Sequence, residues 1–356
     1  MKEATTMVVV GADVHKRTHT FVVVDEVGRK VGEKVVAATS CGHAEAVMWA
    51  RERFGVEVVW GIEDCRHLSA RLERDLLTAG QQVVRVPPKL MAQTRASART
   101  RGKSDPIDAL AVARAVLREP DLPVACHDEV SRELKLLVDR REVVVAQRTA
   151  TINRLRWRVH ELDPERAPQP GSLDRAKHCE MLRSWLETLP GLVAELARDE
   201  LADIIRLSAA IDVLAKRIGT RVREVAPALL GMPGCGELTA AKLVGEAAGV
   251  TRFKSEAAFA RHAGVAPIPV WSGNTAGRVR MTRSGNRQLN AALHRIAVTQ
   301  IRLDGLGRAY YHKRLNAGAS KAEALRSLKR RLARVVHHHL HDDHQNRIQP
   351  CQTAAA

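Results

Sequence analysis

The order of short apolar runs in residues 7–118 constrains the fold of this chain more than any other feature. The run MVVVGAD predicts a strand, and residues 18–39 predict two further antiparallel strands that turn at Val27-Gly28. A helix, the strand VEVVWGIE, a second helix closed by Gly80 and the strand QQVVRVP then follow. Three hairpin-type strands followed by alternating helices and strands match the ribonuclease-H-like order, so we predict an α/β fold with a mixed sheet.

Four acidic residues stand at the ends of these runs or at the start of the next helix. They are Asp13, Glu63, Asp105 and Asp108. Open α/β sheets place their active sites beyond the carboxyl ends of the strands. Four carboxylates in one place repel one another and need a cation, and oxygen ligands favour a hard ion such as Mg²⁺ or Mn²⁺. The sequence therefore predicts a divalent metal site.

The segment DPIDALAVARAV predicts a helix that carries two of these acids. Asp105 fits the N-cap with Pro106 at the first helical position, and Asp108 lies three residues later on the same face. Capping and dipole compensation explain Asp105 well and Asp108 in part. They explain neither Asp13 nor Glu63.

The charge balance points to a polyanionic partner. Lys and Arg total 57 against 40 Asp and Glu, which gives a formal net charge of +17. The segment RASARTRGK is either a solvated loop or a nucleic-acid contact; its basic residues are Arg95, Arg99, Arg101 and Lys103. Aromatic residues make up only 3% of the chain, which argues against a single-strand binder built on base stacking.

Cysteine usage and hydropathy indicate a cytosolic compartment. None of the six cysteines forms a CxxC pair, so we expect reduced thiols. The N-terminus lacks the pattern of a signal peptide, and no stretch reaches the roughly 18 apolar residues of a membrane span.

Residues from about 129 to 225 predict long helices. One runs from about 129 to 162, DPERAPQPG breaks the pattern, and a second runs from about 173 to 225 with an interruption at 189–191. Two long antiparallel helices would form a coiled-coil arm, and such an arm usually serves assembly rather than chemistry.

From residue 226 onward, two glycine-rich segments draw attention. Gly234 and Gly236 suggest the turn of a helix-hairpin-helix, whose free amides would hold a phosphate. WSGNTAGRVRMTRSGNRQ is either a flexible loop or the site of a hydroxyl nucleophile among arginines. The last helix is basic and then histidine-rich, but without a nearby cysteine we do not favour zinc binding.

These motifs together resemble the DEDD transposases of the insertion-sequence "one-ten" family. Members of this family are relatives of the Piv DNA invertases and are described as bridge-RNA-guided recombinases. The likeness covers almost the full chain and rests on the order of short motifs: Gly11-Ala12-Asp13, Ile62-Glu63, Lys103 to Ala109, Pro233 to Gly236, Ala263 to Pro267, Ser272-Gly273 and Thr282 to Asn286. Two positions depart from the pattern: Asp64-Cys65 replace a common Ala-Thr, and Thr282 replaces a common Ser.

The resemblance implies a domain plan. It consists of a RuvC-like DEDD domain over 1–122, a helical coiled-coil arm over 123–225 and a mainly helical transposase domain over 226–345. A disordered tail over 346–356 would follow.

The resemblance also implies an activity. Ser272 matches the family's nucleophile, so the implied reaction is DNA strand exchange through a covalent serine–phosphate intermediate, with the four acids on the metal. Donor DNA, target DNA and a structured guide (bridge) RNA would be the partners, in a homodimer that assembles into a homotetramer at the bacterial nucleoid. The expected nucleic-acid contacts in the last third of the chain are Gly234, Gly236, Arg278, Arg280, Arg283 and Arg287.

Two other functions fit parts of the sequence. A RuvC-type junction endonuclease that uses metal-activated water explains residues 7–118 equally well and leaves the C-terminal half without a role. A non-catalytic architectural DNA-binding protein explains the charge and the helices but not the four acids.

Overall fold

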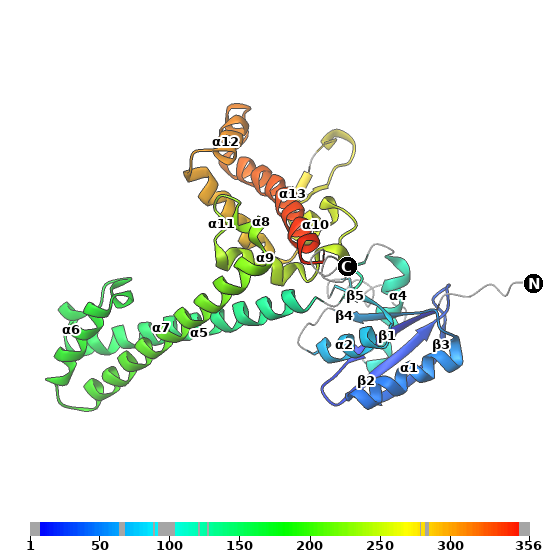
Figure 1. Cartoon of the computed structure of the whole chain (residues 1–356), viewed down its shortest axis with the longest axis horizontal. Helices are drawn as coiled ribbons and strands as arrows, with labels where there is room; N and C mark the ends of the chain where they lie inside the picture. Colours follow the sequence, from blue (N-terminus) through cyan, green and yellow to red (C-terminus); the bar gives the residue numbers. More distant parts are fainter. Residues whose placement is uncertain are drawn as a thin grey trace, which may run out of the picture. The chain divides into compact units, whose positions relative to one another are not determined.

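The computed structural model describes residues 8–63, 68–87, 90–91, 104–119, 122–126, 128–277, 279–281 and 285–348. Its internal contacts divide the chain into two compact units (Figure 1). The sheet unit comprises Met1–Asp128 and Thr251–Lys254, and the helical unit comprises Glu129–Val250 and Ser255–Ala356. The division into three domains and a tail stays a prediction.

The sheet unit is built on five strands in the order β3-β2-β1-β4-β5. The strands are β1 (Val8–Val14), β2 (Thr18–Val24), β3 (Lys30–Ala37), β4 (Val58–Glu63) and β5 (Gln82–Val86). β1, β2 and β3 pair antiparallel, whereas β1 pairs with β4 and β4 with β5 in parallel. The predicted ribonuclease-H-like strand order is therefore confirmed.

Alternation along the strands divides the sheet into two faces. Val10 and Ala12 of β1 belong to the core under α1 (Ser40–Phe54) and α2 (Ala70–Thr78). Val9 lies on the opposite face and packs with Ala109 and Ala113 of α4 (Asp105–Arg118). Figure 1 shows α1 and α2 together on one face of the sheet. Odd-numbered residues of β1 therefore face α4.

Two paired glycines let α4 lie directly on the sheet. Gly11 of β1 and Gly61 of β4 are register partners. A Cβ on Gly11 would lie 2.1 Å from the Ala109 carbonyl oxygen, and a Cβ on Gly61 would lie 2.7 Å from a methyl of Val116. No side chain fits at Gly11 without displacing the helix backbone. This contact fixes the first turn of α4 beside the carboxyl ends of β1 and β4.

Two helices of 34 residues each, α5 (Glu129–Leu162) and α7 (Leu192–Val225), lie side by side in the helical unit (Figure 1). η1 (Pro164–Arg166), η2 (Ser172–Asp174) and α6 (Ala176–Glu187) connect them. Leu155, Leu186 and Leu201 are fully or almost fully buried where the three helices meet. The predicted helices and their interruption are confirmed, and the coiled-coil geometry stays a prediction.

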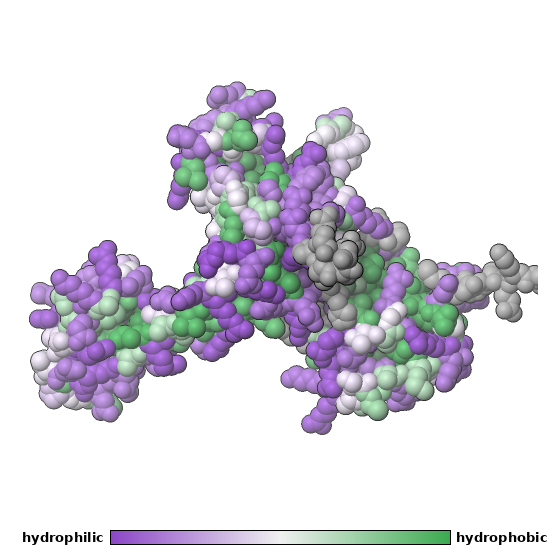
Figure 2. Space-filling model, viewed as in Figure 1, coloured by the Kyte–Doolittle hydropathy of each residue, from purple (hydrophilic) through white to green (hydrophobic). Residues whose placement is uncertain are grey.

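Further helices and one hairpin follow α7 along the chain. They are α8 (Pro227–Leu230), α9 (Glu237–Ala247), α10 (Glu256–His262), β6 (Pro267–Pro269), η4 (Gly273–Thr275), β7 (Val279–Met281), α11 (Arg287–Arg302), α12 (Leu306–Asn316) and α13 (Lys321–Ile348); η3 (Val250–Arg252) joins α9 to α10. Hydrophilic residues cover most of the visible surface of α12 and α13 (Figure 2). α13 continues past residue 346, where the tail was predicted to begin.

None of the described helices is long and apolar enough to cross a membrane.

Candidate active site

Asp13 and His15 mark the end of β1. They follow Gly11 at two-residue spacing, so alternation places Asp13 on the face that carries α4. The Asp13 side chain is 14% exposed and that of His15 is 50% exposed. The backbone N–H of His15 donates to the Thr18 carbonyl oxygen at 3.2 Å, which closes the turn into β2.

The first turn of α4 supplies Asp105 and Asp108. The prediction that Asp105 is the N-cap is wrong by one residue, because Ser104 has the extended N-cap backbone and Asp105 is the first helical residue. The amides of Ile107 and Asp108 both donate to the Ser104 carbonyl oxygen at 3.0 Å, and no side-chain hydrogen bond caps this end of the helix. Asp108 is buried, whereas the Asp105 side chain is 53% exposed.

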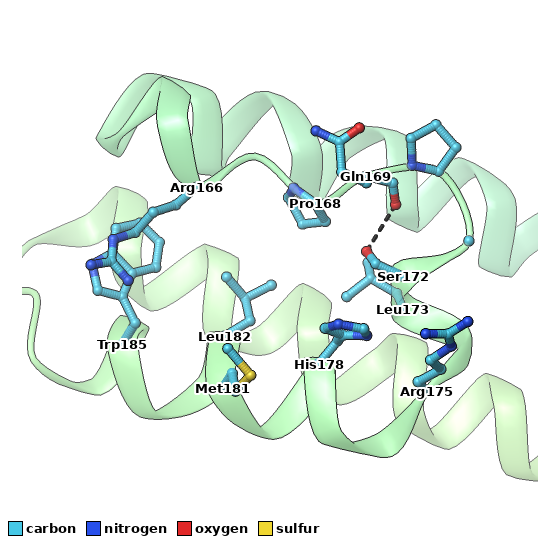
Figure 3. Close-up of a pocket in the computed structure, with 12 residues that line it drawn as sticks. Arg166, Pro168, Gln169, Ser172, Leu173, Arg175, His178, Met181, Leu182 and Trp185 are labelled. Carbon is cyan, nitrogen blue, oxygen red and sulfur yellow. Dashed lines mark hydrogen bonds between the residues drawn. The ribbon is translucent and has the colours of Figure 1, made fainter.

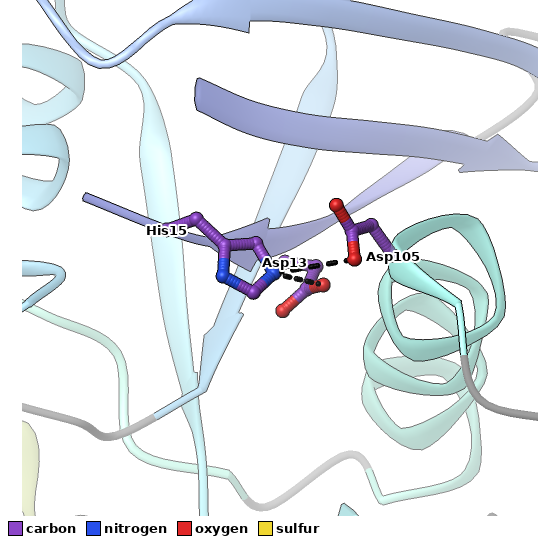
Figure 4. Close-up of side chains that lie close together, drawn as sticks. All are labelled: Asp13, His15 and Asp105. Atoms are coloured by element: carbon purple, nitrogen blue, oxygen red, sulfur yellow. Dashed lines mark hydrogen bonds and ion pairs between the residues drawn. The ribbon is translucent and has the colours of Figure 1, made fainter. Parts of the chain in front are cut away.

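His15 joins Asp13 to Asp105 (Figure 4). Its Nε2 lies 3.0 Å from Oδ2 of Asp13 and 3.4 Å from Oδ1 of Asp105. One ligand atom from each of the three residues lies within 4.8 Å of the other two. Residues distant in sequence therefore meet at the carboxyl end of β1.

Burial and negative neighbours act on Asp13. Burial of its carboxyl raises the pKa of Asp13, and the nearby charges of Asp108 and Asp105 raise it further, while His15 opposes the shift. Proximity of like charges is the condition that a bound divalent cation relieves. The donor set, mainly carboxylate oxygens, fits a hard divalent ion.

Glu63 ends β4 next to this group. Ala12 of β1 pairs with Ile62 of β4 in the parallel register. Asp13 and Glu63 are the next residues on the two strands, so they stand at the same level of the sheet. Glu63 also lies two residues after Gly61, whose missing side chain faces α4, so alternation directs Glu63 to the α4 side. Asp64 and Cys65 lie outside the described residues.

Ser272 stands in the connection of a small hairpin in the helical unit. β6 and β7 pair antiparallel, from Pro267 with Met281 to Pro269 with Val279. Ser272 and the preceding Trp271 are exposed. Gly273 and Gly277 have φ values of 46° and 83°, which favour glycine. The hydroxyl is thus presented on a narrow, accessible turn.

The foot of this hairpin is tightly packed. Gly264 and Gly285 cross so closely that a Cβ on Gly285 would lie 2.2 Å from the Cα of Gly264. The Asn290 amide donates to the carbonyl oxygens of Ala263 and Gly264 at 3.1 and 3.0 Å. Asn290 also accepts a hydrogen bond from the ammonium of Lys329, and burial lowers the pKa of this lysine.

Asn286 fixes the other side of the foot. Its side-chain oxygen caps α11 by accepting from the amides of Gln288 and Leu289, and its amide donates to Glu246 at 2.7 Å. Glu246 in turn accepts from the Lys135 ammonium at 2.7 Å. The Gly-Asn pair of the sequence motif therefore anchors the hairpin in the structure.

The predicted nucleic-acid contacts are only partly described. Arg280 and Arg287 are exposed, as expected for such a role. The other six basic residues that were predicted to contact nucleic acid lie outside the described residues: Arg95, Arg99, Arg101, Lys103, Arg278 and Arg283.

Gly234 and Gly236 lie between α8 and α9. Gly234 has a φ of 80°, and a Cβ there would lie 3.0 Å from Thr299 of α11. Gly236 is the N-cap of α9, and the next residue, Glu237, pairs with Arg223. A carboxylate in the first turn competes with any phosphate for the helix amides. Phosphate binding at this turn stays a prediction.

A separate cavity of about 660 Å³ lies beside α6 (Figure 3). Its lining includes Arg166, Arg175, His178 and Trp185, and the guanidinium of Arg166 stacks over the Trp185 ring at 5.2 Å. None of the residues predicted for catalysis lines it.

Family comparisons agree with this arrangement. Residues 10–164 match the DEDD transposase model of IS110-type elements, and residues 226–312 match the model described as Transposase IS116/IS110/IS902 family. The chain belongs to this transposase family. It is therefore a DNA transposase, an enzyme of DNA strand cleavage and rejoining, and the family and fold indicate dependence on a divalent metal.

Curated relatives of this transposase are insertion-element proteins. The chain is 28% identical to an IS116 protein of Streptomyces clavuligerus, over 92% of this chain and 93% of the relative. It is 26% identical to an IS900 protein of Mycobacterium paratuberculosis, over 92% and 94%. Among solved structures, Thermus thermophilus RuvC in complex with a Holliday junction substrate overlaps 32% of this chain and 95% of its own, with 19% identity and a TM-score of 0.25.

The transposase family does not support a purely architectural role for this chain. His15 was not predicted from the sequence, although the signal was present. A histidine two residues beyond an acid at a strand end lies on the same face of that strand.

Proposed function

We propose that this transposase exchanges DNA strands through a phosphoserine linkage at Ser272, with a divalent metal held by the acid cluster of Asp13, Glu63, Asp105 and Asp108. The observation that carries the proposal is the meeting of Asp13 and Asp105 at the carboxyl end of β1. The family motif identifies Ser272 as the candidate nucleophile, and this residue lies exposed in a turn that a DNA backbone could approach. Mg²⁺ or Mn²⁺ suits the oxygen donors.

Each residue of the acid cluster has a distinct place in this proposal. Buried Asp108 and half-exposed Asp105 present two carboxylates from one helical turn, and Asp13 and Glu63 present two more from adjacent strands. The metal, when bound, supplies charge stabilisation at phosphate oxygens. Close contact between α4 and the backbone of Gly11 fixes Asp105 and Asp108 beside the end of β1.

The serine step conserves atoms and charge. The Ser272 oxygen attacks the scissile phosphorus, the Oγ–P bond forms, and the P–O3′ bond breaks. The serine proton is lost and the 3′-oxygen takes up a proton, leaving a 3′-hydroxyl and a 5′-phosphoserine. Attack by a 3′-hydroxyl from a second strand reverses the step and rejoins DNA. Exposed Arg280 would neutralise charge on the phosphate oxygens.

A structured guide RNA would select donor and target DNA by base pairing in this proposal, leaving the protein to hold backbones. The supporting observation is the net charge of +17. Sequencing the RNA that co-purifies with the full chain tests this step. Activity of RNA-free protein on its own targets would contradict it.

The acid cluster belongs to the sheet unit and Ser272 to the helical unit, so the proposed reaction needs residues of both units. We propose that α5 and α7 pair with their counterparts to form a dimer, and that two dimers form a tetramer on paired DNA sites. Exposed apolar residues on these helices, among them Leu136, Trp157 and Val213, support an assembly surface. Light scattering that finds a monomer both free and on DNA would contradict it.

A covalent-adduct assay tests the proposed reaction. Labelled DNA incubated with the full chain and Mg²⁺ or Mn²⁺ should yield a denaturant-resistant adduct, and Ser272→Ala should eliminate it while Ser284→Ala retains it. Metal-dependent nicking without any adduct would instead support the second candidate, a RuvC-type endonuclease that uses activated water. The ribonuclease-H-like strand order is the observation that favours this second candidate.

A further inference from the structure

His15 is directed at the acid cluster but is not one of its four acids. It lies one residue beyond the end of β1, and its Nε2 is 3.0 Å from Oδ2 of Asp13. Although 50% exposed, its ring turns Nε2 toward two carboxylates from different elements (Figure 4).

The distances match those between neighbouring ligands of a single ion. Two ligand atoms at about 2.1 Å from an ion and at right angles lie about 3 Å apart. The two distances from Nε2, 3.0 Å to Asp13 and 3.4 Å to Asp105, are close to that value. A surface ion pair would join His15 to one carboxylate, whereas its Nε2 lies near two.

We propose that His15 is a nitrogen ligand of the metal centre, and that this nitrogen makes the centre select Mn²⁺ over Mg²⁺. Mg²⁺ strongly prefers oxygen ligands and retains its waters, whereas transition metals accept imidazole nitrogen. The inference rests on the proposed metal centre and adds to it a fifth residue and a metal preference.

Pulsed electron paramagnetic resonance on the full chain with one equivalent of Mn²⁺ tests this directly, because a bound imidazole gives a ¹⁴N coupling. The wild type should show that coupling, and His15→Gln should lose it. His312→Gln makes the same change at an exposed histidine of α12 and should retain it. Titration should show Mn²⁺ affinity falling about tenfold in His15→Gln, with Mg²⁺ affinity nearly unchanged.

A second variant separates ligation from a structural role. His15→Asp replaces the nitrogen by oxygen, so it should keep metal binding, lose the ¹⁴N coupling and shift the preference toward Mg²⁺. Wild type that binds Mn²⁺ without ¹⁴N coupling, or coupling that persists in His15→Gln, would overturn the role of His15. Mn²⁺ binding that is absent, or unchanged in Asp108→Asn, would overturn the metal centre itself and His15 with it.

Discussion

The acid cluster and the Ser272 hairpin are held in place by different means. The acid cluster stands where α4 lies directly on the backbone of Gly11, so its position depends on close packing. The hairpin stands on hydrogen bonds from Asn290 and Asn286, and a Cβ built on Gly273 or Gly277 at its tip would meet nothing within 4 Å. Helix packing against the sheet positions the acid cluster, whereas hydrogen bonds at the foot of the hairpin position the segment that carries Ser272.

This difference matches what each site has to do. Metal ligands must keep their mutual distances to within a fraction of an ångström, which packing against a helix provides. A nucleophile that meets a large substrate from solvent needs an accessible turn on a firm support. The following predictions test this division, beginning with the largest expected effect.

Asp108→Asn should abolish DNA strand cleavage, with a loss of at least about a thousandfold, because a buried ligand charge is removed with little change in volume. Nucleic-acid affinity should stay nearly unchanged in a binding assay. Asp304→Asn, at an aspartate that is 96% exposed on the helical unit, is the matched control and should cleave normally. Full cleavage by Asp108→Asn would remove the acid cluster from the reaction.

Gly11→Ala should weaken metal binding by about tenfold or more and lower the free energy of unfolding by about 1–3 kcal/mol, since the new methyl forces α4 away from β1. Gly277→Ala is the comparison, because its methyl has open space and only the backbone φ of 83° is disfavoured. Mn²⁺ titration should find its affinity unchanged. Equal losses in both variants would contradict the division between packed and open sites.

Asn290→Ala should lower the free energy of unfolding by about 1–3 kcal/mol, because it removes two hydrogen bonds to the 263–264 carbonyls and an acceptor of buried Lys329. Adduct formation should fall, while Mn²⁺ affinity stays at the wild-type value. Calorimetry measures the free energy of unfolding, and metal titration measures the Mn²⁺ affinity. A drop in metal affinity would show that the foot of the hairpin supports more than Ser272.

The smallest effect concerns acid sensitivity of the sheet unit. His19 is buried against the His43 ring, which in turn pairs with Asp75, and burial lowers the pKa of His19 to about 4 from 6.5. Below about pH 6.5, His19 binds a proton in the unfolded chain but stays neutral in the folded chain. The free energy of unfolding is therefore highest above pH 6.5 and decreases as the pH falls toward 4. At pH 5.5 the free energy of unfolding should be lower by about 1 kcal/mol.

His19→Phe keeps a ring in this position and removes the titration. Its stability relative to wild type should therefore rise on going from pH 7 to pH 5.5 by the same roughly 1 kcal/mol, as measured by thermal unfolding. Parallel stability curves for the two proteins would show that His19 does not titrate as its burial requires.

Local signals in the sequence were sufficient for most of the fold. Short apolar runs predicted the strands, and Pro106 and the apolar spacing after it predicted α4. The N-cap was placed one residue late because Asp105 and Ser104 are both favourable caps, and only the backbone decides between them. Glu63 was identified by its place at a strand end, and Gly61 explains why it faces α4.

The contacts that support the hairpin could not be predicted in the same way. Asn290 and Lys329 are 39 residues apart, and neither stands in a recognisable motif. The crossing of Gly264 and Gly285 likewise joins two segments whose glycines alone suggest only turns. Such long-range pairs depend on tertiary packing, and a single sequence carries no local trace of them.

Peptide mapping of the trapped DNA adduct tests the central claim most directly. Trypsin would release residues 262–278 as one peptide, in which Ser272 is the only serine, and Ser284 would fall in the separate peptide 284–287. We predict that mass spectrometry finds the nucleotide on Ser272 in the 262–278 peptide. A nucleotide on the 284–287 peptide would contradict the account, as would cleavage that leaves no nucleotide on the protein.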